Sequence, residues 1–164
     1  MKKTLVVYGS TTGTCEGIAE TIASKLGTEA INVTELDGAQ VAEADNLVLG
    51  TSTWGAGELQ DDWYDGVSLL KGANLDGKTI ALFGCGDSES YCDTFCGAMG
   101  EIYDALKDSG ARFVGQVDAS DYTYDDSTAV HDGKFVGLAL DDVNESDRTE
   151  ERIDAWIEDI KPEL

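Results

Sequence analysis

The chain has 164 residues, of which 33 are acidic and 11 are basic, so its formal net charge is −22. This length predicts a single domain over residues 1–164, and a hydrophobic fraction of 41% is sufficient for a packed core. The few cations argue against nucleic acid as a partner, and the same repulsion disfavours anionic membrane surfaces. The strongly negative electrostatic field of such a chain favours a basic protein as partner. A role in solubility alone, or adaptation to a salty medium, would also account for the excess of acidic residues.

The first residues predict a cytoplasmic protein. The apolar run that begins at Leu5 stops at Gly9, which is too short for the core of a signal peptide. No stretch approaches the roughly 18 apolar residues of a membrane span. In that setting thiols are expected rather than disulfides at all four cysteines, which are Cys15, Cys85, Cys92 and Cys96.

Short apolar runs alternate with stretches of helical periodicity along the chain. Nearly continuous apolar runs are typical of strands that are covered on both faces of a parallel sheet. In chain order, the pattern predicts a strand at 5–8, a helix over 18–26, a strand at 30–33, a short helix near 40–44, a strand at 47–49, a helix over 63–70, a strand at 80–83, a helix over 99–106, strands at 113–114 and 135–140, and a helix over 153–160.

This alternation predicts an α/β fold, because strands that alternate with helices form βαβ units with right-handed crossovers. We expect a three-layer sandwich around a doubly wound parallel sheet of about five strands. The segment between Val117 and Lys134 breaks the alternation, since it is polar and aromatic without a helical period. It is predicted to be a long loop inserted into the last strand, and such loops usually serve function.

Three loops rich in glycine and hydroxyl side chains follow the predicted strands, at residues 9–15, 51–57 and 84–91. Ligands of an open parallel sheet bind beyond the carboxyl ends of the strands, where the strand order reverses. The first loop has neither the lysine of a Walker A motif nor the G-x-G-x-x-G pattern. Its hydroxyls and backbone N–H groups would either hold a phosphate without any cation or simply cap the following helix.

Two aromatic residues, Trp54 and Tyr91, lie in the second and third of these loops. Each residue alone is more typical of partly buried packing. Together, beside a phosphate-binding loop, they indicate a site for a mononucleotide with a flat heterocycle.

The three loops resemble the FMN-binding loops of the flavodoxins, and the similarity extends over nearly the whole chain. The run from Gly133 to Asp141 and the insertion before it resemble the long-chain subgroup of that family. The resemblance implies that the first loop holds the FMN phosphate, that Trp54 lies against one face of the isoalloxazine ring and that Tyr91 stacks on the other. The cofactor-binding residues that it implies are Ser10, Thr11, Thr12, Gly13, Thr14, Cys15, Ser52, Thr53, Trp54, Gly55, Ala56, Cys85, Gly86, Asp87, Tyr91, Thr94, Phe95 and Cys96.

The sequence departs from the family pattern at two positions. Cys15 stands where the family usually has threonine, so one hydroxyl donor to the phosphate is lost, at a cost on the order of 1 kcal/mol. Val143 replaces an acidic residue that is common in the long-chain subgroup, and no flavin contact is assigned there.

The function that the resemblance implies is electron transfer rather than catalysis, with no catalytic residues. Flavodoxins carry one electron between the semiquinone and hydroquinone of FMN. With a net charge of −22 and no lysine or arginine in the three loops, the anionic reduced flavin is disfavoured, which predicts a low potential. By analogy with the family, the Gly55–Ala56 peptide flips so that the Gly55 carbonyl accepts a hydrogen bond from N5–H of the semiquinone.

The expected partners are basic redox proteins, namely flavin reductases and iron–sulfur oxidoreductases, and the chain is expected to be a monomer. An acidic rim around the flavin edge would steer them, although these residues would equally suit a solvated helix surface. The rim comprises Glu58, Asp61, Asp62, Asp65, Asp87, Glu89 and Asp93.

Three alternatives fit the residues less well. An FMN-dependent quinone or nitro reductase on the same fold would need a substrate pocket above the ring and usually forms a dimer. A zinc site of Cys85, Cys92, Cys96 and His131 lacks any C-x-x-C pair. A phospho-acceptor receiver needs an acidic cluster after the first strand, where Ser10 and Thr11 stand instead.

Overall fold

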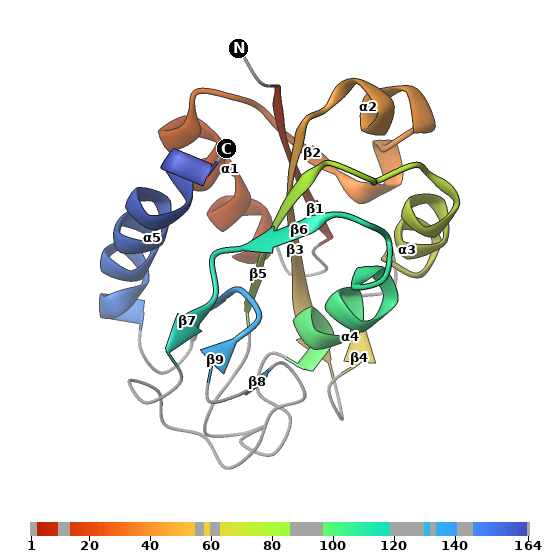
Figure 1. Ribbon diagram of the computed structural model, residues 1–164. Coiled ribbons are helices and arrows are strands. Elements are labelled where there is room, and N and C mark those ends of the chain that lie inside the picture. Colours follow the sequence, from red (N-terminus) through yellow and green to blue (C-terminus); the bar gives the residue numbers. More distant parts are fainter. Residues whose placement is uncertain are drawn as a thin grey trace.

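The computed structural model describes residues 3–9, 14–54, 58–59, 63–85, 97–118, 130–131, 134–140 and 146–163 (Figure 1). In chain order, the elements are β1 (Thr4–Gly9), α1 (Thr14–Leu26), β2 (Ala30–Asn32), η1 (Val33–Glu35), α2 (Gly38–Glu43), β3 (Asn46–Trp54), β4 (Glu58–Leu59), α3 (Trp63–Gly72), β5 (Thr79–Cys85), α4 (Gly97–Leu106), β6 (Arg112–Val114), β7 (Val117–Asp118), β8 (Val130–His131), β9 (Lys134–Phe135), β10 (Leu138–Leu140), α5 (Ser146–Ile160) and η3 (Lys161–Glu163).

The central sheet confirms the predicted doubly wound α/β fold. Its strands run parallel in the order β2-β1-β3-β5-β10, and the two-residue β4 pairs antiparallel with the end of β3. The chain moves outward from β1 to β2, then crosses back to β3 and continues in the opposite direction to β5. The strand order therefore reverses between β1 and β3.

The fifth strand position is filled by two separate pieces of chain. β6 pairs with the first part of β5, from Thr79 to Ala81, and β10 pairs with the second part, from Phe83 to Cys85. The prediction of an insertion within the last strand is confirmed. At its described ends, the insertion forms a small antiparallel sheet in the order β7-β9-β8.

The prediction of one strand over 135–140 is wrong, because that run is divided between the two sheets. Phe135 pairs with Val117 and Val130 in the small sheet, whereas Leu138 begins the pairing with β5. Between them the chain bends at Gly137, where an added Cβ would lie only 2.1 Å from the carbonyl oxygen of Leu82. An apolar run does not reveal such a bend.

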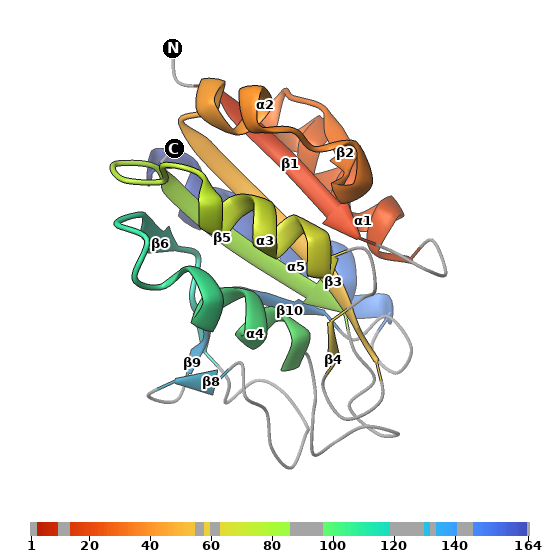
Figure 2. The ribbon, with the colours of Figure 1, turned by 90° about the vertical axis from the view of Figure 1, so that its right-hand side faces the viewer.

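Helices cover both faces of the sheet (Figures 1 and 2). Because alternate strand residues point to opposite faces, Val7, Leu49 and Leu82 pack with α2, α3 and α4, whereas Val48 and Phe83 pack with α1 and α5. The helical stripes predicted from the sequence are the buried faces of these helices, with side chains such as Ile22, Leu70, Met99 and Trp156.

The short helix α2 illustrates how local sequence fixes an element. Asp37 accepts a hydrogen bond from the backbone N–H of Gln40 at 2.8 Å, and the Gln40 side chain accepts one from the N–H of Asp37 at 2.9 Å. This reciprocal capping box explains why so short a segment is helical.

Among the described residues, no helix combines the length and apolarity needed to cross a membrane.

Candidate functional site

The strands of the central sheet end together at one edge. Gly9 at the end of β1 is opposite Thr51 of β3, which is opposite Gly84 of β5. Leu140, the last residue of β10, is opposite Cys85. The segments that follow these strands therefore leave the sheet from the same side, as the sequence predicts.

The reversal of strand order between β1 and β3 places two helices on opposite sides of this edge. α1 follows β1 and packs on the face that contains Val6, whereas α3 follows β3 and packs on the face that contains Val7. In doubly wound sheets, the diverging connections at such a point leave a crevice that binds ligands. This point is the candidate site.

The amino end of α1 lies at the site. Only residues 10–13 separate Gly9 from Thr14, the first residue of this 13-residue helix. Backbone N–H groups without helical partners and the positive end of the helix dipole therefore face the crevice. The first turn contains Glu16 and no lysine or arginine, so the donors for an anion there are neutral.

Beside α1, the end of β3 forms a hairpin that extends beyond its neighbour. β3 continues two residues past the Ser52–Cys85 pair, and β4 folds back on it with Thr53 opposite Leu59 and Trp54 opposite Glu58. The loop predicted at 51–57 is thus wrong for residues 51–54, because strand pairing continues through Trp54. The same applies to Gly84 and Cys85, which belong to β5. The backbone of Trp54 is held by this pairing.

Close packing of the strands and helices that lead to the site holds their ends in place. The carbonyl oxygen of Gly50 accepts a 2.7 Å hydrogen bond from the indole N–H of the fully buried Trp63. A Cβ at Gly50 would lie 2.0 Å from the ring of Phe83, and one at Gly84 would lie 3.2 Å from the Cβ of Met99. Gly50 leaves space on β3 for the ring of Phe83, and Gly84 lets α4 approach β5 closely, so the supporting structure is tightly packed.

The charges around Tyr8, at the end of β1 that leads to α1, are negative. Burial raises the pKa of the Tyr8 phenol, and the nearby carboxylates of Glu16, Glu20 and Glu35 raise this pKa further. The phenol also forms a hydrogen bond with Glu16. An anion bound at the start of α1 would therefore depend on backbone dipoles and hydroxyls alone.

Residues 6–156 match the family model described as Flavodoxin. The chain belongs to the flavodoxin family. It is 42% identical to flavodoxin 1 of Azotobacter vinelandii over 171 residues, which cover 100% of this chain and 98% of the relative. It is also 39% identical to flavodoxin 1 of Escherichia coli, with 100% and 96% coverage.

A solved flavodoxin has nearly the same structure. The crystal structure of Fusobacterium nucleatum flavodoxin bound to flavin mononucleotide superposes with a TM-score of 0.93 at 31% identity, covering 100% of this chain and 99% of that one. The near-complete coverage in both directions and the insertion between β6 and β10 agree with the long-chain subgroup of flavodoxins.

The structure places part of the predicted flavodoxin site. The backbone positions of Thr14, Cys15, Ser52, Thr53, Trp54 and Cys85 lie at the carboxyl edge described above. Twelve predicted residues lie outside the described part of the chain, namely Ser10, Thr11, Thr12, Gly13, Gly55, Ala56, Gly86, Asp87, Tyr91, Thr94, Phe95 and Cys96.

The alternative metal site receives no support from the described residues, where no group of His, Cys, Asp and Glu side chains is arranged to hold a metal ion. His131 belongs to β8 of the small sheet, and Cys92 and Cys96 lie outside the described residues.

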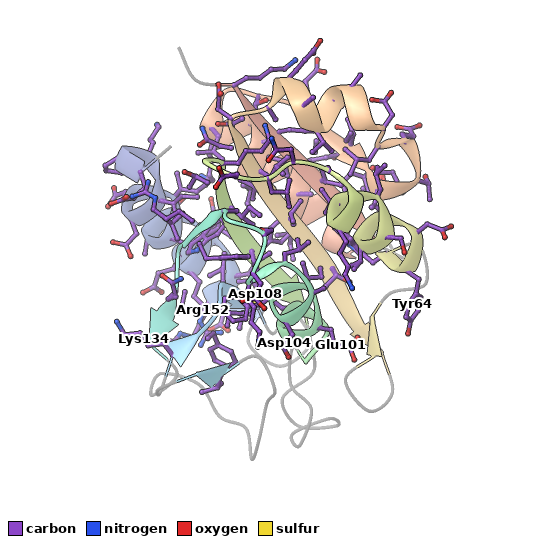
Figure 3. All side chains as sticks on the ribbon, turned by 45° about the vertical axis from the view of Figure 1, so that its right-hand side comes forward. Tyr64, Glu101, Asp104, Asp108, Lys134 and Arg152 are labelled. Carbon is purple, nitrogen blue, oxygen red and sulfur yellow. The ribbon has the colours of Figure 1, made fainter. Side chains whose placement is uncertain are left out.

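One surface residue near the site was missed by the sequence reasoning. Tyr64, in the first turn of α3, is 53% exposed, and Figure 3 shows it projecting from the helix away from the sheet. The signal was present, because the apolar stripe of Trp63, Val67 and Leu70 leaves position 64 on the outer face of a helix.

Proposed function

We propose that this protein is a low-potential, one-electron carrier that binds FMN non-covalently at the carboxyl edge between β1 and β3. The observation that carries the proposal is the amino end of α1, which follows β1 after only four residues at the point where the strand order reverses. Membership of the flavodoxin family and the FMN bound to the Fusobacterium nucleatum relative support the same assignment.

The proposed site would hold a mononucleotide through three groups of residues. The loop at residues 10–15 and the start of α1 would hold the phosphate through hydroxyls and backbone N–H groups. Trp54, on the paired end of β3, and Tyr91 would enclose the isoalloxazine ring. Backbone groups of residues 53–56, 85–86 and 94–96 would bind its polar edge, so the protein contributes binding, orientation and exclusion of water.

Bound FMN supplies the redox chemistry, which is the exchange of single electrons between its semiquinone and hydroquinone forms. The protein makes the second reduction difficult because the added charge lies within a chain of net charge −22. For a one-electron couple, each 1.4 kcal/mol of destabilisation of the reduced form lowers the potential by about 59 mV.

The partners would be basic redox proteins, such as flavin reductases and iron–sulfur oxidoreductases, that meet a monomeric carrier. Asp65 of the acidic rim is exposed on α3, and Glu101 and Asp104 are exposed on the neighbouring α4. The other rim residues have side chains outside the described part of the chain. A strongly negative surface would steer basic partners toward this edge in a salt-dependent manner.

Anaerobic stepwise reduction, followed by visible absorbance, tests the function. A one-electron carrier begins as a yellow protein, passes through a long-wavelength blue semiquinone and bleaches only at low potential. A yellow protein that goes directly to hydroquinone, and turns over quinone with NAD(P)H without an added reductase, would support the quinone or nitro reductase instead. A colourless protein that takes up no added FMN would contradict the cofactor assignment.

A further inference from the structure

Tyr64 is an exception to the burial of aromatic residues in this fold. Its 53% exposure is the highest among the large hydrophobic side chains that the structure describes. Trp63, Phe83, Phe135 and Trp156 are at most 3% exposed, and the remaining described aromatic rings are buried or half-buried. A single exposed tyrosine is ordinary on its own, so its surroundings decide what it can do.

The position of Tyr64 is fixed by its neighbours in α3. The indole of Trp63 is fully buried and bonded to the carbonyl of Gly50. On the same helix, Gly66 is buried so closely that a Cβ there would lie 2.3 Å from a side-chain carbon of Val33. Because these two contacts prevent α3 from rotating, the Tyr64 ring cannot turn into the core and is held facing solvent.

The start of α3 lies next to the proposed flavin site. The chain reaches Trp63 directly after the β3–β4 hairpin, whose tip follows Trp54. The hydrogen bond between Trp63 and Gly50 ties the helix to the middle of β3. A partner that contacts Tyr64 is therefore placed at the edge where the proposed flavin-binding loops converge.

The charges around Tyr64 select the chemistry of that partner. Asp65 is exposed beside it, and the lysine of α3, Lys71, lies in the last turn at the other end of the helix. A second copy of this chain would bring another net charge of −22 to the same place. The face of an aromatic ring attracts cations, and Asp65 adds to that attraction.

We propose that Tyr64 is the aromatic anchor of the surface that docks a basic redox partner. An arginine or lysine of the partner would lie over the Tyr64 ring while its charge is neutralised by Asp65. Tyrosine suits this role because it offers a large contact area with few rotatable bonds to immobilise. The proposal rests on the proposed function for the redox nature of the partner, but the contact itself is independent of electron transfer.

The test uses ferric cytochrome c as a basic protein probe and the FMN-loaded protein at low ionic strength. Titration calorimetry gives the dissociation constant with the oxidised protein, and stopped-flow absorbance gives the rate of electron transfer from the photoreduced protein. Benzoquinone, a small neutral acceptor, reports electron transfer without docking. The variants are Tyr64→Leu, Tyr64→Phe and the control Ala155→Ser, which changes an exposed position of α5 on the other face of the sheet.

Tyr64→Leu is expected to weaken binding and slow the reaction with cytochrome c about two- to fivefold, with the benzoquinone rate unchanged. Tyr64→Phe and Ala155→Ser should keep the wild-type values, since the ring or the whole anchor remains. Wild-type binding by Tyr64→Leu, an equal loss in Tyr64→Phe, or no binding of cytochrome c by the wild-type protein would each overturn the proposal. Binding that depends on Tyr64 in a protein that transfers no electron would support the anchor and contradict the proposed function.

Discussion

Tyr8 connects the core of the sheet to the charged surface of α1. Its ring packs between the sheet and α1 at 9% exposure, and its phenol forms a hydrogen bond with Glu16. Because burial and three surrounding glutamates raise its pKa above 10.0, the folded protein holds the phenolic proton more tightly than the unfolded chain does. The residue therefore links stability to alkaline pH.

Below pH 10 the phenol is neutral in both states, so the full stability is present. As the pH rises from 10 through the higher pKa of the folded state, the unfolded chain releases its proton first and stability falls. Tyr8→Phe should make this alkaline decline shallower, because no phenol remains to ionise. Urea unfolding followed by tryptophan fluorescence from pH 8 to pH 11 measures the effect.

Tyr64→Phe is the matched control for the urea unfolding experiments, since it removes a phenol from an exposed position. Its stability should fall at alkaline pH as steeply as that of the wild type. Part of the decline also persists in Tyr8→Phe, because the hydrogen bond and charge of Asp154 raise the pKa of Lys25. A Tyr8→Phe profile as steep as that of the wild type would contradict the assignment.

Gly55 is the residue at which the proposed redox function depends most on backbone freedom. A flip of the Gly55–Ala56 peptide would stabilise the semiquinone, and glycine tolerates it because positive φ costs it little. Gly55→Val should therefore narrow the gap between the two FMN potentials. Spectroelectrochemical titration measures that gap. An unchanged yield of semiquinone in Gly55→Val would contradict the proposed peptide flip.

At the scale of elements, α1 connects the site to the opposite edge of the sheet. It begins beside the site at Thr14 and ends in a Schellman motif at Gly27, whose φ is 72°. In this motif the N–H of Thr28 donates to the carbonyl of Ala23 at 2.9 Å, and the N–H of Gly27 donates to that of Ser24 at 3.2 Å. The end of the helix therefore requires a left-handed residue.

Two glycines of this region give a matched pair of substitutions. Gly27→Ala should lower the free energy of unfolding by about 1–2 kcal/mol, because alanine is strained at positive φ. Gly17→Ala, at an exposed position within α1 where a Cβ meets nothing within 4 Å, should raise it by about 0.5–1 kcal/mol. Chemical denaturation measures both, and a loss of stability in Gly17→Ala equal to that in Gly27→Ala would contradict this account.

The fold was predictable because its strands are buried on both faces. Strands such as residues 80–83 have helices on both sides of the sheet, so nearly all of their side chains are apolar. Such a strand can be recognised in the sequence from its continuous apolar run alone. Strand ends were not predictable in this way. Residues 51–54 are polar or aromatic, yet they stay in β3 because β5 and β4 supply hydrogen-bond partners that are distant in sequence. For the same reason, the sequence of residues 135–140 does not show that this segment is divided between two sheets.

The candidate site was predictable to the extent that it follows from topology. Gly9, Thr51 and Gly84 lie side by side because parallel strands end at one edge, and the apolar runs of the sequence mark where β1, β3 and β5 lie. The stripe of α3 already leaves position 64 on the outer face, but how firmly Tyr64 is held there depends on Trp63 and Gly66, which make contacts between elements.

For the molecule as a whole, unbalanced charge adds to the conformational entropy that opposes folding. At least 22 acidic residues have no basic counterpart, and ion pairs such as Lys3–Glu43 are exposed, where they contribute little. Repulsion among the remaining carboxylates disfavours the compact state. Raising KCl from 0.1 to 1 M shortens the Debye length from about 10 to about 3 Å, so it should raise the urea midpoint.

Urea is the appropriate denaturant for this experiment because it is uncharged, and FMN is kept saturating at every salt concentration. The double variant Glu158→Gln/Asp159→Asn removes two exposed charges of α5 and should show a smaller response to salt than the wild type. A midpoint that falls with KCl would show that repulsion does not limit stability.

The two faces of the sheet are completed at different times during synthesis on the ribosome. α2, α3 and α4, which cover one face, are made before residue 107, whereas α5, which joins α1 on the other face, starts at Ser146. Until α5 has emerged, Phe83 lacks the ring of Trp156, which packs edge-on against it at a centroid distance of 6.4 Å in the folded state. The nascent chain therefore carries one finished and one open apolar surface, and the open one is where a chaperone would bind or aggregation would start.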